Sequence, residues 1–203
     1  MPTAQRNMLD IFQKHPSLVS ARHALLGSPR RAEAERFIHE VFSRRYGAQV
    51  TAFAPNLLLL EQNKQVIAAT GWRAANDTTL FLERYLDLPI ERAMAELADQ
   101  PVARDRIVEV GNLAADKNGS TIHVILKLAE FLNDLGYEWV VFTATRELIG
   151  IFSRLGLPLL ALTPANPERL GETAAEWGSY YDMQPIVVAG KIRIGLERAG
   201  KLA

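Results

Sequence analysis

Apolar residues recur at every third or fourth position between Ser28 and Gly47, which is the clearest periodic pattern in the chain. Pro29 suits the first turn of a helix, Ser28 can cap its start and Gly47 can end it. The pattern therefore predicts a helix over 30–45 that packs against the core by one face. The residues on that face are Ala34, Phe37, Ile38, Val41 and Phe42.

Strands are predicted where apolar and β-branched residues run together. The segment NLLLLEQNKQVIAATGWRAA, residues 56–75, is typical of a β-hairpin with a polar turn at 62–64. The polar segment 163–184, which contains prolines, is typical of a loop. The same reasoning predicts strands over 20–27, 78–86, 106–114, 139–144 and 185–192, and helices over 8–13, 89–100, 120–135, 146–156 and the C-terminal tail.

The order of these elements is a mostly antiparallel first half followed by a β-α-β-α second half. This order predicts an α/β domain with a mixed, mostly antiparallel central sheet flanked by helices. Because the chain contains no repeat, low-complexity segment or linker, we expect residues 1–203 to form a single domain.

Composition narrows the function classes. The chain has no cysteine, which excludes disulfides, thiolate catalysis and cysteine-ligated metals, and its four histidines show no metal-ligand spacing. Lysine and arginine balance aspartate and glutamate at 23 each, which argues against a nucleic-acid partner. The first 15 residues lack the features of a signal peptide, and no apolar run approaches the ~18 residues of a membrane span. We therefore expect a cytoplasmic protein without a metal and without stable membrane insertion.

The first candidate site is the turn 116–121, which follows the strand over 106–114 and opens the next helix. Gly119 and the free N–H groups of a helix start can cradle an anion such as phosphate. The alternative is simple capping of the helix by Asn118, Ser120 or Thr121, and the local residues alone favour it.

The second candidate is Glu109, a single carboxylate within the apolar strand RIVEVGNLA. A buried glutamate needs a partner or carries a raised pKa, which is the condition for a general base near neutral pH. Gly111 and Asn112 suggest a bulge that opens the strand pairing. Arg73 is the candidate partner, and a solvated or arginine-paired glutamate without a catalytic role is the equal alternative.

The segment from strand 106–114 to the end of helix 146–156 resembles the acyl-CoA-binding core of the GNAT acyltransferase superfamily. The resemblance implies a strand that separates from its neighbour to admit pantetheine, and a turn that binds the CoA phosphates on backbone amides. Asp116 stands where that family has a basic or amide residue, so either Lys117 compensates for its charge or the donor is not CoA. The thioester-binding residues implied are Leu113, Ala114, Ala115, Lys117, Asn118, Gly119, Ser120 and Thr121.

Nearly the whole chain resembles the thermostable hemolysin family. The blocks that carry this resemblance are RRYGA (44–48), ATGWRAA (69–75), LFLERYLDLPIE (80–91), IVEVGNLAA (107–115), WVVFTAT (139–145) and WGSYYD (177–182). That family in turn is similar to the acyl-homoserine lactone synthases, which share the GNAT fold.

The synthase resemblance implies a site built from Phe42, Arg73 and Glu109, with Asn112 where a synthase has arginine. The paired aspartates of the synthases are missing, so acyl transfer is implied without homoserine lactone formation. A tyrosine that protonates the leaving thiolate in many GNAT enzymes is replaced here by Phe152. The candidates to take its place are Thr143, Tyr180 and Tyr181, and an unassisted thiolate is the alternative.

Taken together, the resemblance implies an N-acyltransferase with an acyl-CoA or acyl carrier protein thioester as co-substrate and a small amine, similar to an amino acid, as acceptor. Glu109 is the expected base, and a tunnel between the sheet and the first helix, lined by Phe42, Trp72 and Phe81, is expected to hold the acyl chain. Five arginines of helix 30–45 could form a docking face for an acidic carrier protein, and the favoured alternative is a solvated face without a partner. A membrane-lytic protein and a non-catalytic acyl-CoA sensor remain the alternatives.

Overall fold

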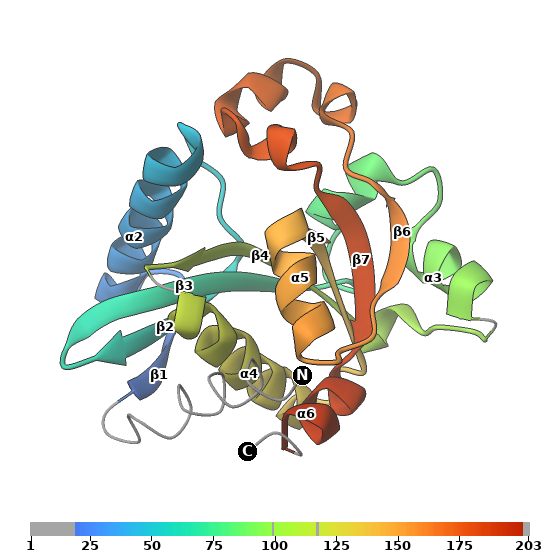
Figure 1. The fold of residues 1–203 in the computed structure, drawn as a ribbon, viewed down its shortest axis with the longest axis horizontal. Helices are drawn as coiled ribbons and strands as arrows, with labels where there is room; N and C mark the ends of the chain where they lie inside the picture. The colour runs from blue at the N-terminus through green and yellow to red at the C-terminus, as the bar shows by residue number, and fades with distance from the viewer. Residues whose placement is uncertain (1–18, 99, 117, 201–203) are drawn as a thin grey trace.

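The computed structural model describes residues 19–98, 100–116 and 118–200. Its centre is a seven-stranded sheet with the order β1-β2-β3-β4-β5-β7-β6 (Figure 1). All neighbouring strands are antiparallel except β4 and β5, which run parallel. The strands are β1 (Val19–Ala24), β2 (Asn56–Gln62), β3 (Gln65–Ala74), β4 (Ile107–Ala115), β5 (Trp139–Ala144), β6 (Leu160–Pro164) and β7 (Ile186–Lys191).

Four leucines of β2 explain why both faces of the sheet are covered. Successive residues of a strand point to opposite faces. Leu57 and Leu59 pack with α2 (Pro29–Tyr46), whereas Leu58 and Leu60 pack with α4 (Asn118–Asp134). The two helices therefore lie on opposite faces of the sheet.

The remaining helices complete two outer layers (Figure 1). On the α4 side lie α5 (Arg146–Arg154) and α6 (Ile192–Gly200). On the α2 side, the sheet is covered by α3 (Ile90–Ala98) and by short 3-10 helices. These are η1 (Phe81–Tyr85), η3 (Pro167–Trp177) and η4 (Tyr180–Met183), and a further one, η2 (Arg104–Arg106), precedes β4. None of the described helices is both long and apolar enough to cross a bilayer.

Most predicted elements are confirmed to within three residues at each end, but the strand predicted over 78–86 is wrong. This segment forms η1, because Leu82 and Tyr85, three positions apart, are both buried on the α2 side of the sheet. The Glu83 carboxylate accepts the Leu80 N–H at 2.8 Å and thereby closes the start of this turn. The helix predicted over 8–13 lies outside the described residues.

Two further expectations need correction. Gly47 ends α2 in the left-handed conformation as predicted, with φ of 67°, but the Ser28 side chain makes no capping hydrogen bond. The segment predicted as a loop over 163–184 contains the end of β6 and both η3 and η4. These short helices bring the aromatic WGSYYD block back against α2.

Candidate active site

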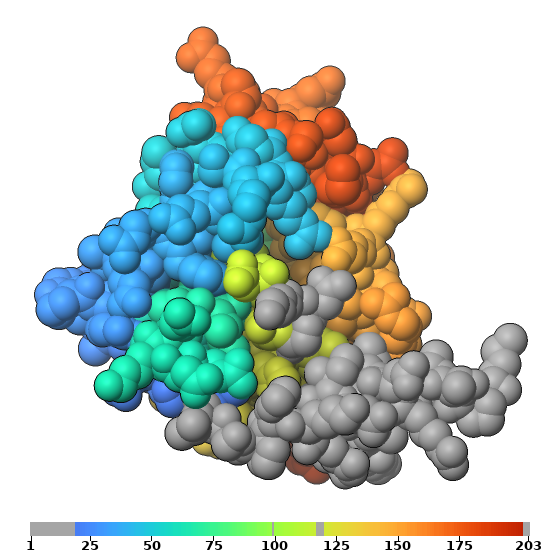
Figure 2. Space-filling view, turned by 60° about the vertical axis from the view of Figure 1, so that its left-hand side comes forward, coloured from blue at the N-terminus to red at the C-terminus, as the bar shows by residue number. Residues whose placement is uncertain are grey.

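A cavity of about 180 Å³ opens on the α2 side of the sheet and extends to the point where β4 and β5 separate. Its walls come from α2, the loop after it, β3, η1, β4, β5, the first turns of α4 and α5, and the η3–η4 segment. Figure 2 views its mouth, between the end of α2, the end of β4 and α5.

The separation of β4 and β5 gives the cavity its shape. The two strands pair from Ile107–Trp139 to Val110–Phe142 and then diverge. Beyond this point β4 pairs only with β3, and β5 pairs only with β7. The pairing of β3 with β4 shifts near Gly111, and Asn112 has a left-handed φ of 51°. The bulge predicted at Gly111 and Asn112 is therefore present, and the residues of β4 around it line the cavity.

Glu109 is only 6% exposed and is held by three donors. Its Oε2 accepts the Phe81 N–H and its Oε1 accepts the Leu82 N–H, both at 2.9 Å. Arg73 Nε lies 3.2 Å from Oε2. Burial raises the pKa of Glu109 above its usual value, and the charge of Arg73 with the two N–H donors offsets only part of that effect. The carboxylate is therefore fixed in orientation and retains a tendency to accept a proton.

Arg73 is paired directly opposite Glu109 on β3, as the prediction required. Its side chain is 24% exposed and lines the cavity. Only the Nε atom is engaged by a described residue, so the two Nη groups are available to a ligand. A guanidinium in this arrangement can bind a carboxylate through two parallel hydrogen bonds.

The far end of the cavity is aromatic. The Trp177 ring is within 6.3 Å of four other rings, measured between centroids. Tyr85 and Tyr181 share a hydrogen bond between their hydroxyl oxygens at 2.5 Å. Burial raises the pKa of Tyr85 to about 12, although its bond with Tyr181 acts in the opposite direction. Burial also raises the pKa of Tyr180 and of Tyr181, so all three hydroxyls keep their protons at neutral pH.

Charged residues from three elements meet at the cavity mouth. Arg44 of α2 lies 3.1 Å from Asp116 at the end of β4, and Arg45 pairs with Glu147 at the start of α5. The charge of Asp116, which disfavours phosphate in the turn, is thus offset by Arg44, a partner that the sequence did not indicate. Lys117, which was expected to compensate for this charge, lies outside the described residues.

The proposed basic docking face of α2 is largely used within the chain. Arg31 is buried and donates to the carbonyl oxygens of Ala54 and Pro55, at 2.8 and 2.6 Å. Arg30 pairs with Glu61. With Arg44 and Arg45 also paired, Arg36 is the one arginine of the five for which the described residues provide no ion pair.

A second, apolar chamber of about 80 Å³ lies on the opposite face of the sheet, beneath α4 and α5. Val110, Leu113, Phe142 and Leu148 line both spaces, so the two meet where β4 and β5 diverge. An apolar chain that passes between the diverging strands would enter this chamber and leave water.

Eleven of the predicted site residues are brought together by the main cavity. They are Phe42, Arg73, Phe81, Glu109, Asn112, Leu113, Ala115, Thr121, Thr143, Tyr180 and Tyr181. Asn112 has a different task from the one expected, because its Oδ1 accepts the Ala54 N–H and its Nδ2 donates to the Ala52 carbonyl. Its amide braces the loop after α2.

Three predicted residues lie outside the main cavity. Trp72 was expected to line the tunnel beside α2, and this is wrong: it neighbours Arg73 on β3 and packs on the opposite face, against Phe131 of α4 and Tyr137. Ala114 is buried in the core beneath α2 and does not line the cavity. Ser120 also lies outside the cavity lining, and the side chains of 118 and 119 are not described.

The sequence analysis did not single out Tyr85, and it left open whether the aromatic loop that begins at Trp177 lines a pocket or packs on the surface; both residues line the cavity. Tyr85 was hidden by the strand predicted over 78–86, although its spacing of three from Leu82 was a signal of the 3-10 turn. Trp177 and Phe42 are more than 100 residues apart in the sequence, so no local pattern indicates that their rings are in contact. Among the described residues, no cluster of three histidine, aspartate or glutamate side chains could hold a metal ion.

Comparison with known families matches residues 25–196 to the family model of thermostable hemolysin. No curated protein matches in sequence.

Solved structures match over most of the chain at low identity. FeeM, an N-acyl amino acid synthase from uncultured soil microbes, aligns with a TM-score of 0.60 and 9% identity, covering 91% of this chain and 96% of its own. The acyl-homoserine lactone synthase LasI aligns with a TM-score of 0.58 and 13% identity, covering 88% and 93%. BjaI, a CoA-dependent acyl-homoserine lactone synthase solved with SAM and isopentyl-CoA, gives 0.57 and 13%, covering 91% and 89%. The predicted GNAT-like fold is confirmed.

Proposed function

The chain belongs to the thermostable hemolysin family, and we propose that it is an N-acyltransferase, which moves an acyl group from an acyl thioester to the amine of a small, amino-acid-like acceptor. The observation that carries this proposal is the buried, oriented carboxylate of Glu109 beside the gap between β4 and β5. The gap offers a thioester the free backbone of β4, and the raised pKa of Glu109 suits a general base.

The donor lies along β4 beyond the bulge. The amides of pantetheine pair with the edge of β4 that β5 leaves free, from Gly111 to Ala115. The phosphate end points toward Thr121 and the start of α4, where helix N–H groups favour an anion. The ion pair with Arg44 offsets the negative charge of Asp116, which would otherwise repel the phosphate.

The acyl chain passes between the diverging strands into the apolar chamber beneath α4 and α5. This path replaces the tunnel expected between the sheet and α2, because the chamber is apolar throughout most of its lining and Trp72 lies on that side. The chamber meets the main cavity at Val110 and Phe142, beside the bulge. The thioester carbonyl is then near Glu109, one residue before Val110.

The acceptor occupies the part of the cavity between Arg73 and the aromatic end. The free Nη groups of Arg73 bind an acceptor carboxylate, which leaves its amine close to Glu109. Phe81 and Trp177 form the apolar wall for the acceptor side chain. FeeM is described as an N-acyl amino acid synthase, which supports an acceptor of this class.

In the reaction, the amine nitrogen attacks the thioester carbonyl carbon while its proton passes to Glu109, directly or through a water. A backbone N–H at the bulge stabilises the oxyanion. The C–N bond then forms the amide, and the C–S bond breaks with departure of the thiolate. The thiolate takes a proton from Thr143, Tyr180, Tyr181 or water, or leaves unprotonated, since a thiol pKa is ~8.5.

A CoA thioester is the donor to test first, because four of the five arginines expected to dock a carrier protein are paired within the chain. Thermal unfolding is measured with free CoA and with acyl-CoAs of increasing length. At about a hundred times its dissociation constant, a ligand adds roughly 2.7 kcal/mol of stability. We expect a melting temperature that rises with chain length and then levels off.

The preferred donor is then combined with a panel of amino acids, and the released thiol is measured with a thiol-specific reagent. The chain contains no cysteine, so the protein gives no background in this assay. No stabilisation by any acyl-CoA, together with no thiol release from a carrier-protein thioester, would contradict the proposal. Leakage of red cells caused by the protein without a donor would favour the membrane-lytic alternative.

A further inference from the structure

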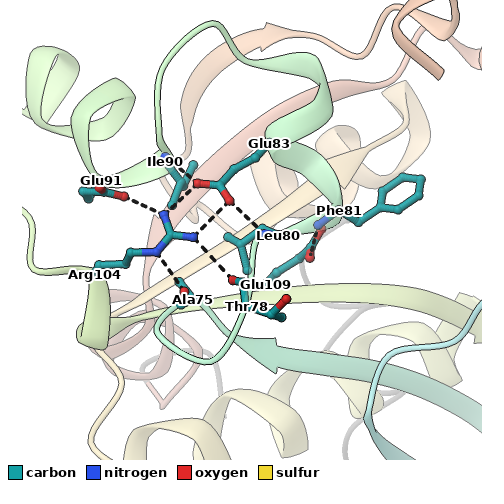
Figure 3. Close-up of polar contacts among 9 residues, drawn as sticks. All are labelled: Ala75, Thr78, Leu80, Phe81, Glu83, Ile90, Glu91, Arg104 and Glu109. Atoms are coloured by element: carbon teal, nitrogen blue, oxygen red, sulfur yellow. Dashed lines mark hydrogen bonds and ion pairs between the residues drawn. The ribbon is translucent and has the colours of Figure 1, made fainter. Parts of the chain in front are cut away.

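Arg104, five residues before Glu109, is bound along every edge of its guanidinium (Figure 3). Its Nε donates to the Ala75 carbonyl at 2.8 Å. Both Nη groups bind Glu83, at 2.7 and 3.0 Å, and Nη1 also reaches Glu91 of α3 at 2.7 Å. Arg104 therefore ties together the end of β3, η1 and the start of α3.

Glu83 extends this network to two backbone amides. Its Oε2 accepts the Leu80 N–H at 2.8 Å, and its Oε1 accepts the Ile90 N–H at 2.9 Å (Figure 3). Burial alone would raise the pKa of Glu83, but the hydrogen bonds from Arg104, Ile90 and Leu80 outweigh burial and hold the pKa below its usual value. Glu83 is thus ionised at neutral pH and fixes the segment from 80 to 90 at both ends.

The same segment orients Glu109. The amide that Glu83 holds belongs to Leu80, and the next two amides, of Phe81 and Leu82, are the donors to the Glu109 carboxylate. Two carboxylates therefore bind three consecutive N–H groups: Glu83, from within η1, accepts the first, and Glu109, from β4, accepts the next two. A displacement of the turn at Glu83 must move both donors of Glu109.

We propose that Arg104 and Glu83 are positioning residues, which hold η1 so that its N–H groups direct a free lone pair of Glu109 toward the acceptor amine. The inference rests on the proposed role of Glu109 as base. Neither Arg104 nor Glu83 lines the cavity, so their effect on catalysis passes through η1. A misplacement of about 1 Å in a reacting group can cost on the order of 10²-fold in rate.

The test compares Arg104→Met with Arg106→Met and Arg104→Lys. Arg106 belongs to the same 3-10 turn but donates to the Gly136 carbonyl at 3.0 Å, away from η1, and so serves as the matched control. Hydrogen exchange of the Phe81 and Leu82 amides is followed by NMR, with the amides of Val108 and Val141 in the central strands as an internal reference. Transfer kinetics are measured with the donor and acceptor found by the thiol assay.

In Arg104→Met we expect exchange at Phe81 and Leu82 to accelerate by at least about tenfold, with unchanged exchange in β4 and β5. We expect kcat to fall roughly 10- to 100-fold while the KM for the acyl-CoA stays within about twofold. Arg104→Lys should restore part of kcat, and Arg106→Met should match the wild type in both measurements.

Exchange no faster than in Arg106→Met overturns the proposal, and so does faster exchange with unchanged kcat. Either result leaves the acyltransferase function intact. A wild-type protein that transfers no acyl group to any amine instead overturns the proposed function, and the positioning role with it. Comparable losses of kcat and of global stability in all three variants would also overturn the proposal, because Arg104 would then support only the fold.

Discussion

Arg73 and Glu109 are directly opposite each other on adjacent antiparallel strands, with Arg73 Nε 3.2 Å from Glu109 Oε2. The two side chains differ in exposure, 24% for the arginine and 8% for the glutamate. The guanidinium therefore reaches the cavity while the carboxylate lies beneath it, held by two backbone N–H groups. This arrangement separates two tasks, because Arg73 can bind an anion and Glu109 can accept a proton.

Replacing Glu109 with Gln should lower kcat by about 10²- to 10⁴-fold, the range for loss of a general base. Acyl-CoA should still raise the melting temperature, because the proposed donor site is formed by β4 and the apolar chamber. A non-catalytic sensor would have no turnover to lose. Glu61→Gln is the matched control, since Glu61 is equally buried at 6% and arginine-paired but lies away from the cavity. Equal loss in both variants would contradict the base role.

The pH dependence of kcat/KM should show a rising limb with an apparent pKa above the ~4.3 of an ordinary glutamate. The cause is burial, which raises the pKa of Glu109 and keeps it protonated, and so inactive as a base, at acidic pH. The limb should disappear in Glu109→Gln. A second acceptor with a different amine pKa identifies any limb that belongs to the substrate. A limb whose apparent pKa changes only with the amine pKa of the acceptor would contradict the role of Glu109 as the general base.

The same shift affects stability. The unfolded chain releases the Glu109 proton at a lower pH than the folded protein, because the folded pKa is raised. The contribution of Glu109 to the free energy of unfolding is therefore complete below ~4.3 and decreases as pH rises through the folded pKa. In denaturant titrations across this pH range, the free energy of unfolding of the wild type should fall relative to that of Glu109→Gln as pH rises. A difference that is independent of pH would show that the pKa is not raised.

Arg73→Lys should raise the KM for a carboxylate-bearing acceptor by about tenfold or more, since lysine keeps the charge but loses the two-pronged geometry. The KM for the donor should change little. Arg84→Lys is the control, because Arg84 stacks over the Phe81 ring at 4.8 Å on the outside of η1. Acceptors without a carboxylate should not respond to Arg73→Lys. A uniform effect on all acceptors would limit Arg73 to its contact with Glu109.

The cross-strand pair could be predicted from the sequence because hairpin periodicity identifies β3 and an apolar run identifies β4. The same periodicity excludes Trp72 from the cavity, and the prediction of a tunnel lined by Trp72 overlooked this. Trp72 and Arg73 are consecutive in one strand and must point to opposite faces, so only one of them can line the cavity.

The turn η1 could not be predicted from strand periodicity, and the spacing of three between Leu82 and Tyr85 was its local signal. Leu80 and Leu82 alternate as in a strand, but their segment is fixed by Glu83 and Arg104, and its amides are taken by Glu109, far along the chain. The apolar chamber and the aromatic end depend in the same manner on distant contacts. Local sequence patterns indicate which residues of an element are buried, but they do not indicate which distant side chain accepts hydrogen bonds from the N–H groups of that element.

Ala129→Leu should shorten the longest acyl chain that the protein accepts. Ala129 of α4 lines the apolar chamber, and a larger side chain there fills space that the proposed acyl path requires. Overpacking of a full core costs about 1–3 kcal/mol, and the free volume of the chamber should keep the cost of this substitution at or below that range. The plateau in melting temperature across the acyl-CoA series is the measurement. Val41→Ile, on the α2 side of the main cavity, is the control. If Val41→Ile rather than Ala129→Leu lowers the chain length at which the melting temperature levels off, the acyl chain runs beside α2.

Gly178→Ala should detach the aromatic end of the cavity from α2. Gly178 has φ of 53° and ψ of −130°, and an added Cβ would lie 2.0 Å from the Tyr46 carbonyl oxygen. That same oxygen accepts the Ser179 N–H at 2.8 Å, so the turn cannot move away without losing this bond. The close approach places Trp177 and Tyr180 against Phe42. Alanine must therefore displace the WGSYYD block.

Gly171 provides the control, because its φ of 58° and ψ of −135° are nearly the same and an added Cβ would meet nothing within 4 Å. Gly171→Ala should cost only the backbone strain, about 1–3 kcal/mol. Gly178→Ala should exceed it by at least about 1 kcal/mol, since it adds the clash and the lost hydrogen bond. It should also weaken acceptor binding, which Gly171→Ala should not do. Denaturant unfolding and acceptor KM check both points, and equal effects of the two substitutions would mean that the contact with Tyr46 does not hold the aromatic wall in place.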